Sequence, residues 1–170
     1  MKQVWHAILQ EDYNKWDIKK LQEEYTFYKN SHPLPYKKLI FPDTKEVIKN
    51  FHAKGYKLAL ASSSTMNDIL IALEETGLKI YFSAILSGED FPESKPHPAI
   101  YEDAIRKLGV SKDNILVIED SEKGISAGIS AGLEVWAIED KTFGMNQESA
   151  NQLVDNLSQF FEQVAISQEI

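Results

Sequence analysis

The sequence predicts an α/β protein built on a doubly wound, Rossmann-like parallel sheet. From residue 43 onward, short apolar runs alternate with segments of helical periodicity. The apolar runs lack strict alternation, which is typical of strands covered on both faces, and a repeated strand–helix order favours parallel strands. The expected strands are residues 57–61, 84–86, 115–118 and 133–138. The expected helices are residues 67–75, 99–108, 122–131 and about 149–164.

The first 35 residues have a different pattern. Trp5 and Ile8 lie on one apolar stripe with helical spacing, and Ile18 and Leu21 lie on another. Three prolines between residues 31 and 42 then disfavour helix. We therefore expect a helical segment over residues 1–35 and an α/β core over residues 36–170.

The first helix of the core is predicted to begin at Asp43. Asp43 and Glu46 have the spacing of a capping box, and Val47 and Phe51 give the helix an apolar face. Gly55 is well suited to the position just after the helix ends.

Composition excludes several classes of partner. The chain has 18 Lys and Arg against 26 Asp and Glu, a net charge of −8, with no basic patch for nucleic acid. It has no cysteine, which excludes disulfides and thiolate metal sites and leaves oxygen-bound cations such as Mg²⁺. Residues 1–10 lack the apolar run of a signal peptide or membrane span, so we expect a soluble cytoplasmic protein without a membrane partner.

Serines follow the first predicted strand of the core. In open α/β sheets, ligands bind beyond the carboxyl ends of the strands, where Ser62 and Ser63 stand here. Their hydroxyl and backbone N–H groups are candidates for binding an anion such as phosphate. The alternative is an ordinary turn, because serine is common in turns and at helix starts.

A lysine followed by two prolines lies in the loop after the second predicted strand. Pro96 and Pro98 restrict the backbone next to Lys95, which makes its ammonium a candidate to offset the charge of a phosphoryl group. The alternative is a solvated surface lysine. His97 is interpreted as a helix-entry residue.

Two adjacent carboxylates follow the third strand. Glu119 and Asp120 at the end of a buried strand require a positive partner, and a divalent cation is one candidate. The alternative is that Asp120 or Ser121 caps the next helix. Gly124 and Gly128 would let that helix pack closely on the sheet.

Together, the three clusters resemble the second, third and fourth motifs of the haloacid dehalogenase superfamily, most closely its β-phosphoglucomutase-like branch. The resemblance implies hydrolysis or transfer of phosphate on small esters such as sugar phosphates. It implies that Ser62 hydrogen-bonds the phosphoryl group, that Lys95 offsets its charge, and that Glu119 and Asp120 hold Mg²⁺. Residues 1–35 are then similar to the later part of the family's helical cap.

The first motif of that family, a strand ending in a nucleophilic Asp-x-Asp, has no counterpart in the 170 residues. Residues 39–44 do not replace it, because Pro42 cannot donate a ladder hydrogen bond and Lys45 stands where a second aspartate is needed. The resemblance therefore implies that the sequence is truncated, that its Mg²⁺ site is incomplete, and that the chain alone is inactive.

In the family that first strand lies in the middle of the sheet, between the strands that end here at Ser62 and Glu119. Burying its apolar side chains is worth on the order of 10 kcal/mol, comparable to the whole stability of a domain, about 5–15 kcal/mol. Four arrangements would close the gap: direct pairing of the flanking strands, insertion of another segment, donation of a strand within a homodimer, or docking of a separate fragment.

Two alternative functions remain open from the sequence. One is a catalytically dead remnant that serves as a binding or dimerising module. A response-regulator receiver domain also uses carboxylates, Mg²⁺ and a Lys-Pro pair, but there the acidic pair precedes the lysine, whereas Lys95 precedes Glu119 here.

Overall fold

The computed structural model describes residues 2–166, which divide into two compact units at residues 35 and 36. The first unit contains the helices α1 (Lys2–Leu9) and α2 (Ile18–Ser31), joined by the 3₁₀ turn η1 (Gln10–Lys15). The indole N–H of Trp5 donates to the side-chain oxygen of Gln22 at 2.9 Å, which ties α1 to α2. The helices expected in this segment are therefore found.

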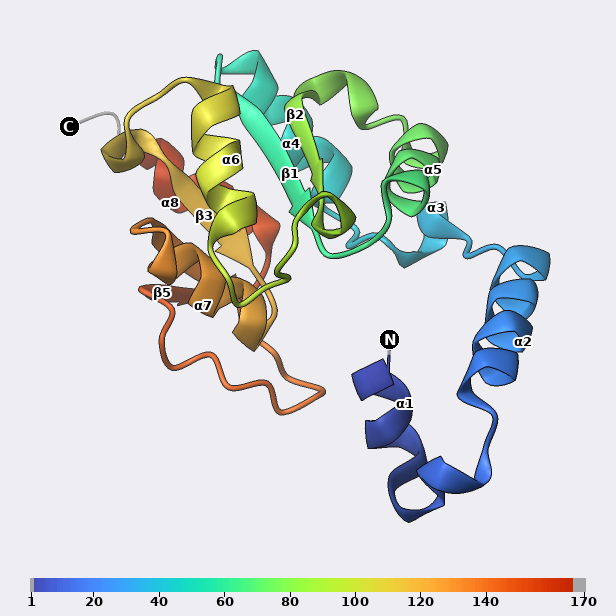
Figure 1. The fold of residues 1–170 in the computed structure, drawn as a ribbon. Helices are drawn as coiled ribbons and strands as arrows, with labels where there is room; N and C mark the ends of the chain where they lie inside the picture. The colour runs from blue at the N-terminus through green and yellow to red at the C-terminus, as the bar shows by residue number, and fades with distance from the viewer. Residues whose placement is uncertain (1, 167–170) are drawn as a thin grey trace. The chain divides into compact units, whose positions relative to one another are not determined.

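The second unit alternates strands and helices (Figure 1). Its helices are α3 (Tyr36–Leu39), α4 (Thr44–Ala53), α5 (Met66–Thr76), α6 (Ala99–Leu108), α7 (Glu122–Ser130) and α8 (Leu157–Ile166). Its strands are β1 (Leu58–Ser62), β2 (Phe82–Ser87), β3 (Leu116–Glu119), β4 (Glu134–Ile138) and β5 (Gln152–Val154). Short 3₁₀ turns are η2 (Lys79–Tyr81), η3 (Gly88–Asp90) and η4 (Lys112–Asn114). No helix within residues 2–166 has the length and apolar character needed to cross a membrane.

All strand pairs are parallel. β1 pairs with β2, and β3, β4 and β5 form a second sheet in that order. Every strand pair is joined through a helix or a long connection, as parallel strands require. The predicted α/β fold with parallel strands is confirmed.

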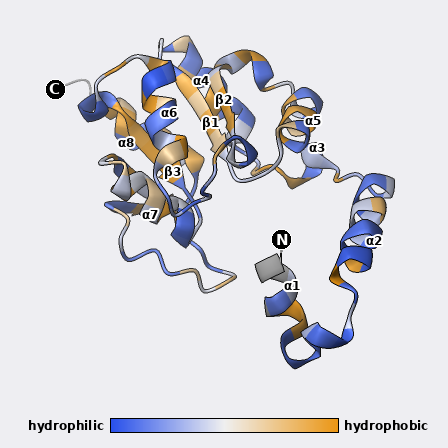
Figure 2. Ribbon diagram, in the orientation of Figure 1, coloured by the Kyte–Doolittle hydropathy of each residue, from blue (hydrophilic) through white to orange (hydrophobic). Residues whose placement is uncertain are grey.

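Helices cover both faces of the strands. On one face, Ile100 of α6 and Ile125 of α7 pack with strand residues such as Leu86 and Val135. On the other face, Phe51 of α4 packs with α8 and with residues of β3 and β4. Figure 2 shows the strands coloured as hydrophobic between helices of mixed colour, which explains why the strand segments read as continuous apolar runs rather than alternating ones.

The predicted start of the last helix, at about residue 149, was wrong. Gln152–Val154 form β5, which pairs with Trp136–Ile138 of β4, and α8 begins only at Leu157. Leu153 and Val154 fit an apolar helical stripe as well as they fit a strand. The pairing with the edge of β4 therefore determines that this segment is a strand.

The predicted capping role of Asp43 was also wrong. Its side chain makes no capping hydrogen bond to α4. Its carboxylate instead accepts from the backbone N–H of Ser158 at 2.8 Å and from the hydroxyl of Ser158 at 3.0 Å. Asp43 therefore joins the start of α4 to the start of α8.

Candidate active site

Lys95 occupies the centre of the candidate site. Its side chain is only 8% exposed, which excludes a solvated surface lysine. Its ammonium donates to Oε1 of Glu119 at 2.5 Å, to the carbonyl of Ala61 at 3.1 Å and to the hydroxyl of Tyr101 at 3.1 Å. These contacts use all three N–H donors of the ammonium. Lys95 thus connects the carboxyl end of β1 to that of β3.

Glu119 is held from several sides. Besides Lys95, the hydroxyl of Tyr101 donates to Oε1, and Ser121 donates its hydroxyl proton to Oε2 at 3.2 Å. The Glu119 side chain is 9% exposed, so this carboxylate is charge-compensated and almost out of solvent. Glu119 therefore positions Lys95 in this geometry.

Gly124 makes room for the Glu119 carboxylate. A Cβ built on Gly124 would lie 2.1 Å from the Glu119 carboxyl carbon, and one on Gly128 would lie 2.6 Å from Cγ2 of Val135. Both glycines therefore let α7 pack closely against β3 and β4, as the sequence indicated. Ser121 caps α7 by accepting from the N–H of Gly124 at 3.1 Å.

The serines lie in the turn after β1. The Ser62 hydroxyl oxygen accepts from the backbone N–H of Ser64 at 3.1 Å, which leaves its own proton available to a ligand. Ser63 is exposed. A Cβ at Gly88 would lie 3.0 Å from the Ser63 Cα, so Gly88 allows the loop after β2 to approach this turn.

Asp120 is the exposed member of the acidic pair. Its carboxyl group is nevertheless partly shielded from solvent, and this partial burial, followed by the neighbouring Glu119 charge, raises the pKa of Asp120, while a backbone hydrogen bond and the Lys95 charge act in the opposite direction. Its backbone carbonyl accepts from the amide of Gln147 at 2.9 Å.

Gln147 was missed in the sequence. It is 8% exposed, and besides Asp120 it donates to the carbonyl of Ile138 at 2.8 Å and accepts from the N–H of Asp140 at 2.8 Å. It therefore fastens the loop after β4 to the loop after β3. A lone glutamine in a polar loop offers no pattern that would have revealed this.

Tyr101 was also missed. Its position in α6 fits the apolar stripe of that helix, and its ring is buried with the core. Burial, followed by the Glu119 charge, raises the pKa of Tyr101, so the hydroxyl remains protonated and donates to Glu119. His97, in contrast, serves helix entry as expected: its Nδ1 accepts from the N–H of Ala99 at 3.3 Å.

The described residues do not complete a Mg²⁺ site. Mg²⁺ prefers octahedral oxygen coordination, usually with one or two carboxylates besides water and phosphate. Within residues 2–166, no three acidic, histidine or cysteine side chains are grouped to hold a metal ion. Glu119 is already paired with Lys95, which leaves the Asp120 carboxylate as the ligand that this acidic pair can offer.

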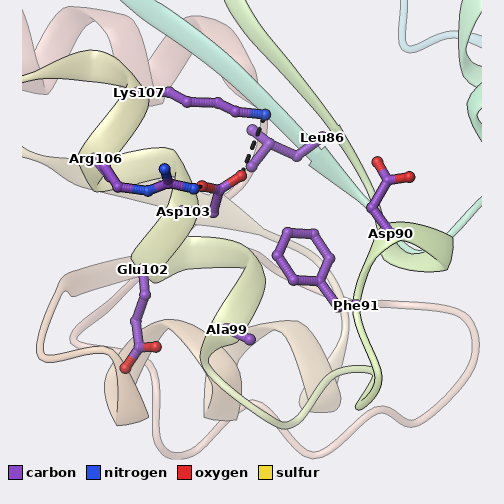
Figure 3. A pocket seen from close by; sticks show the side chains of 8 residues that line it. All are labelled: Leu86, Asp90, Phe91, Ala99, Glu102, Asp103, Arg106 and Lys107. Carbon is purple, nitrogen blue, oxygen red and sulfur yellow. Dashed lines mark hydrogen bonds and ion pairs between the residues drawn. The ribbon is translucent and has the colours of Figure 1, made fainter.

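A separate hollow lies between β2 and α6 (Figure 3), with a volume of about 640 Å³. Its two cations, Arg106 and Lys107, both contact the Asp103 carboxylate. Although burial opposes the change, hydrogen bonds from Lys107 and Arg106 lower the pKa of Asp103. Because its cations are already paired and no predicted site residue lines it, this hollow is not the candidate active site.

The parallel α/β fold places serine, lysine and acidic side chains at the carboxyl ends of its strands, where open α/β sheets bind their ligands. The haloacid dehalogenase-like hydrolase family matches residues 1–138. The chain therefore belongs to the haloacid dehalogenase-like hydrolase family.

Two curated phosphatases are similar to this chain in sequence. A phosphoglycolate phosphatase from Vibrio parahaemolyticus is 30% identical over 134 residues, covering 75% of this chain and 58% of that protein. A phosphorylated carbohydrates phosphatase from Thermotoga maritima is 34% identical over 93 residues, covering 55% of this chain and 43% of that protein. The chain thus spans about half the length of these curated relatives.

Solved structures agree on the fold. A β-phosphoglucomutase from Clostridium difficile superposes with a TM-score of 0.78 at 23% identity, covering 99% of this chain and 76% of that one. CbbY from Rhodobacter sphaeroides, solved in complex with phosphate, gives a TM-score of 0.65 at 26% identity, covering 70% of this chain and 55% of that one.

Proposed function

We propose that this chain forms the phosphate-binding part of a phosphatase or phosphomutase that acts on small phosphorylated molecules, with sugar phosphates as the substrate class. The observation that carries the proposal is the buried Lys95, whose ammonium joins the end of β1 to Glu119 at the end of β3. A buried cation at the carboxyl ends of parallel strands is suited to the charge that develops on a transferring phosphoryl group. The phosphatase relatives support the same class.

Each site residue has a distinct role in this proposal. Ser62 donates its free hydroxyl proton to a phosphoryl oxygen, and the neighbouring Ser63, which is exposed, adds a further donor. Lys95 offsets the phosphoryl charge by exchanging its bond to the Ala61 carbonyl for a phosphoryl oxygen, while Glu119 and Tyr101 keep it in place. Asp120 is the carboxylate that the chain would contribute to a Mg²⁺ site.

The 170 residues alone are not expected to complete the reaction. They contain no Asp-x-Asp sequence, so no aspartate is assigned as the attacking nucleophile, and phosphoryl transfer requires a carboxylate from additional polypeptide. We therefore expect the chain alone not to hydrolyse phosphate esters.

A phosphatase assay tests both the proposed role in phosphoryl transfer and the expected inactivity of the chain alone. The purified chain is incubated with p-nitrophenyl phosphate and Mg²⁺, with and without a peptide that carries an apolar strand ending in Asp-x-Asp. We expect no turnover by the chain, turnover on adding the peptide, and loss of that turnover in Asp120→Ala and Lys95→Met. A peptide with Asn-x-Asn is the matched control.

Two outcomes would contradict the proposal. Turnover by the chain alone that Asp120→Ala abolishes would show that a nucleophile lies within the 170 residues. Absence of turnover with a peptide that demonstrably binds would favour a catalytically inactive binding module.

A further inference from the structure

Ser87, the last residue of β2, is fully buried beside the candidate site. It is 0% exposed, although serine is mostly a surface residue. A buried hydroxyl requires hydrogen-bond partners, and the structure gives this one two of them. It donates to the carbonyl of Ser64 at 2.7 Å and accepts from the backbone N–H of Glu89 at 3.2 Å. The Ser87 hydroxyl therefore joins the turn after β1 to the turn after β2.

The bond that this hydroxyl accepts has an ordinary explanation. Ser87 precedes η3, and a serine at the start of a turn commonly accepts from a backbone N–H two residues later. The bond that it donates has a different consequence, because Ser64 lies 23 residues earlier in the sequence. That bond adds nothing to η3, so its effect falls on the turn after β1.

The backbone of Ser64 is held at both its N–H and its C=O. The N–H donates to the hydroxyl oxygen of Ser62 at 3.1 Å, and the C=O accepts from Ser87. The start of the turn is fixed independently, because Ser62 is the register partner of Ser87 in the paired strands β1 and β2. Ser87 thus fixes the position of Ser64, and the Ser64 N–H in turn orients the Ser62 hydroxyl.

Gly88 brings the two turns into backbone contact at the same place. A Cβ on Gly88 would lie 3.0 Å from the Cα of Ser63 and 3.4 Å from the carbonyl oxygen of Ser62. No side chain separates the two backbones at this point. The turn that carries Ser62 and Ser63 therefore rests directly on the segment that Ser87 begins.

We propose that Ser87 is a positioning residue for phosphate binding, which acts through Ser64 to set the direction in which the Ser62 hydroxyl donates. The inference rests on the proposed function, in which that proton is donated to a phosphoryl oxygen. A hydroxyl whose oxygen already accepts a hydrogen bond has fewer orientations left for its proton. The donor is then aimed before the ligand arrives, which lowers the cost of ordering the turn on binding.

Titration of inorganic phosphate into the isotope-labelled chain, followed by the amide NMR signals of the turn, tests the inference. In Ser87→Ala the Ser64 carbonyl loses its donor, and we expect phosphate to bind about tenfold more weakly. Ser87→Cys keeps a weak S–H donor at the same position. Its phosphate affinity should therefore lie between those of Ser87→Ala and the original protein.

Thr76→Val is the matched control, because it also removes a buried hydroxyl. Thr76 is 6% exposed, and its hydroxyl donates to the carbonyl of Ala72 at 2.7 Å, one turn earlier in α5. Whatever stability this variant loses in urea unfolding, its phosphate affinity should equal that of the original protein. The control therefore separates a general loss of stability from a loss of positioning.

Two results of the titration would overturn the inference. They are equal phosphate affinities of Ser87→Ala and the original protein, and an equal weakening by Thr76→Val. Absence of phosphate binding by the original protein would contradict the proposed function instead, and exchange of the Ser64 amide hydrogen would then decide on Ser87. Exchange about tenfold faster in Ser87→Ala but not in Thr76→Val supports the link from Ser87 to the Ser64 N–H, and unchanged exchange overturns it.

Discussion

The ammonium of Lys95 and the carboxylate of Glu119 form an ion pair at 2.5 Å in which the two side chains are 8% and 9% exposed. Buried charges are costly to desolvate, and such a pair is stable only while each partner remains compensated. The pair therefore gives the candidate site a fixed charge arrangement. It also makes the site sensitive to the loss of either partner.

Removing one member of this pair should destabilise the protein strongly. We expect Lys95→Met and Glu119→Leu each to lower the free energy of unfolding by about 3–5 kcal/mol, because each leaves a buried charge uncompensated. The double variant should lose much less than the sum. Urea unfolding of the four proteins measures the coupling energy.

The exposed pair of Lys141 and Asp155 is the matched control for that cycle. Their charged atoms lie 2.6 Å apart, but the side chains are 63% and 58% exposed. Lys141→Met should therefore lower the free energy of unfolding far less than Lys95→Met does. Equal losses at the two lysines would contradict a special role for burial at Lys95.

Tyr101→Phe tests whether the tyrosine hydroxyl holds the ion pair in place. The ring remains in the core, but Lys95 loses an acceptor and Glu119 loses a donor. We expect a loss of about 1–3 kcal/mol in the free energy of unfolding. Tyr56→Phe is the control, because the Tyr56 hydroxyl has no hydrogen-bond partner among residues 2–166, and it should change stability little.

Gly124→Ala tests the close approach of α7 to Glu119. The new methyl group would lie 2.1 Å from the carboxyl carbon, so the carboxylate or the helix must move. We expect a loss of about 1–3 kcal/mol, as for other overpacked positions, even though alanine favours helix. Ser130→Ala, at an exposed position of the same helix, should be neutral or slightly stabilising in the same urea titration.

The sequence predicted the strands and helices that carry the site well, because apolar runs and helical stripes arise from local burial. It placed Ser62 and Glu119 at strand ends and Lys95 in the loop after the second predicted strand, and the structure brings Lys95 into contact with Glu119. It did not predict that Tyr101 shares their network, since a tyrosine on an apolar helix face is also typical of plain packing.

Contacts between segments far apart in the sequence were not predicted either. Gln147 acts through loops whose relative positions only the fold determines. The strand β5 forms because it pairs with the edge of β4. The Asp43 carboxylate accepts a hydrogen bond from Ser158, which lies far away in the sequence. Such tertiary partners override local preferences.

Gln147 should prove sensitive to the direction of its hydrogen bonds. Gln147→Glu retains an acceptor for the Asp140 N–H but sets a carboxylate against the carbonyls of Asp120 and Ile138. We expect a loss of about 1–3 kcal/mol or more at neutral pH. The loss should shrink in acid, where the new carboxyl becomes protonated and can donate.

Gln159→Glu is the control for this substitution. The Gln159 side-chain oxygen accepts from the N–H of Asp155 at 2.6 Å, and a carboxylate retains that role. Its stability should therefore differ little from that of the original protein at either pH. A Gln147→Glu variant that behaved the same way would show that the loops are not held through this amide.

Asp120→Asn should make the protein slightly more stable at neutral pH. Burial and the Glu119 charge raise the pKa of Asp120 in the folded state, so the folded protein binds its proton more tightly than the unfolded chain does. The favourable contribution of the protonated form is present below the unfolded pKa of about 3.9 and is lost as pH rises through the higher folded pKa. Asparagine removes this loss, and because Asp120 is exposed the gain should be small.

Unfolding curves for Asp120→Asn between acid and neutral pH measure this difference. The variant and the original protein should be equally stable well below the unfolded pKa and should diverge as pH rises. Asp113→Asn, at an exposed turn position, is the control for replacing an aspartate by asparagine. A variant less stable than the original at neutral pH would mean that favourable contacts hold the Asp120 carboxylate. It would then be a structural group, and the proposed role toward a cation would lose its physical support, because a carboxylate kept charged at a cost to stability is what a cation ligand requires.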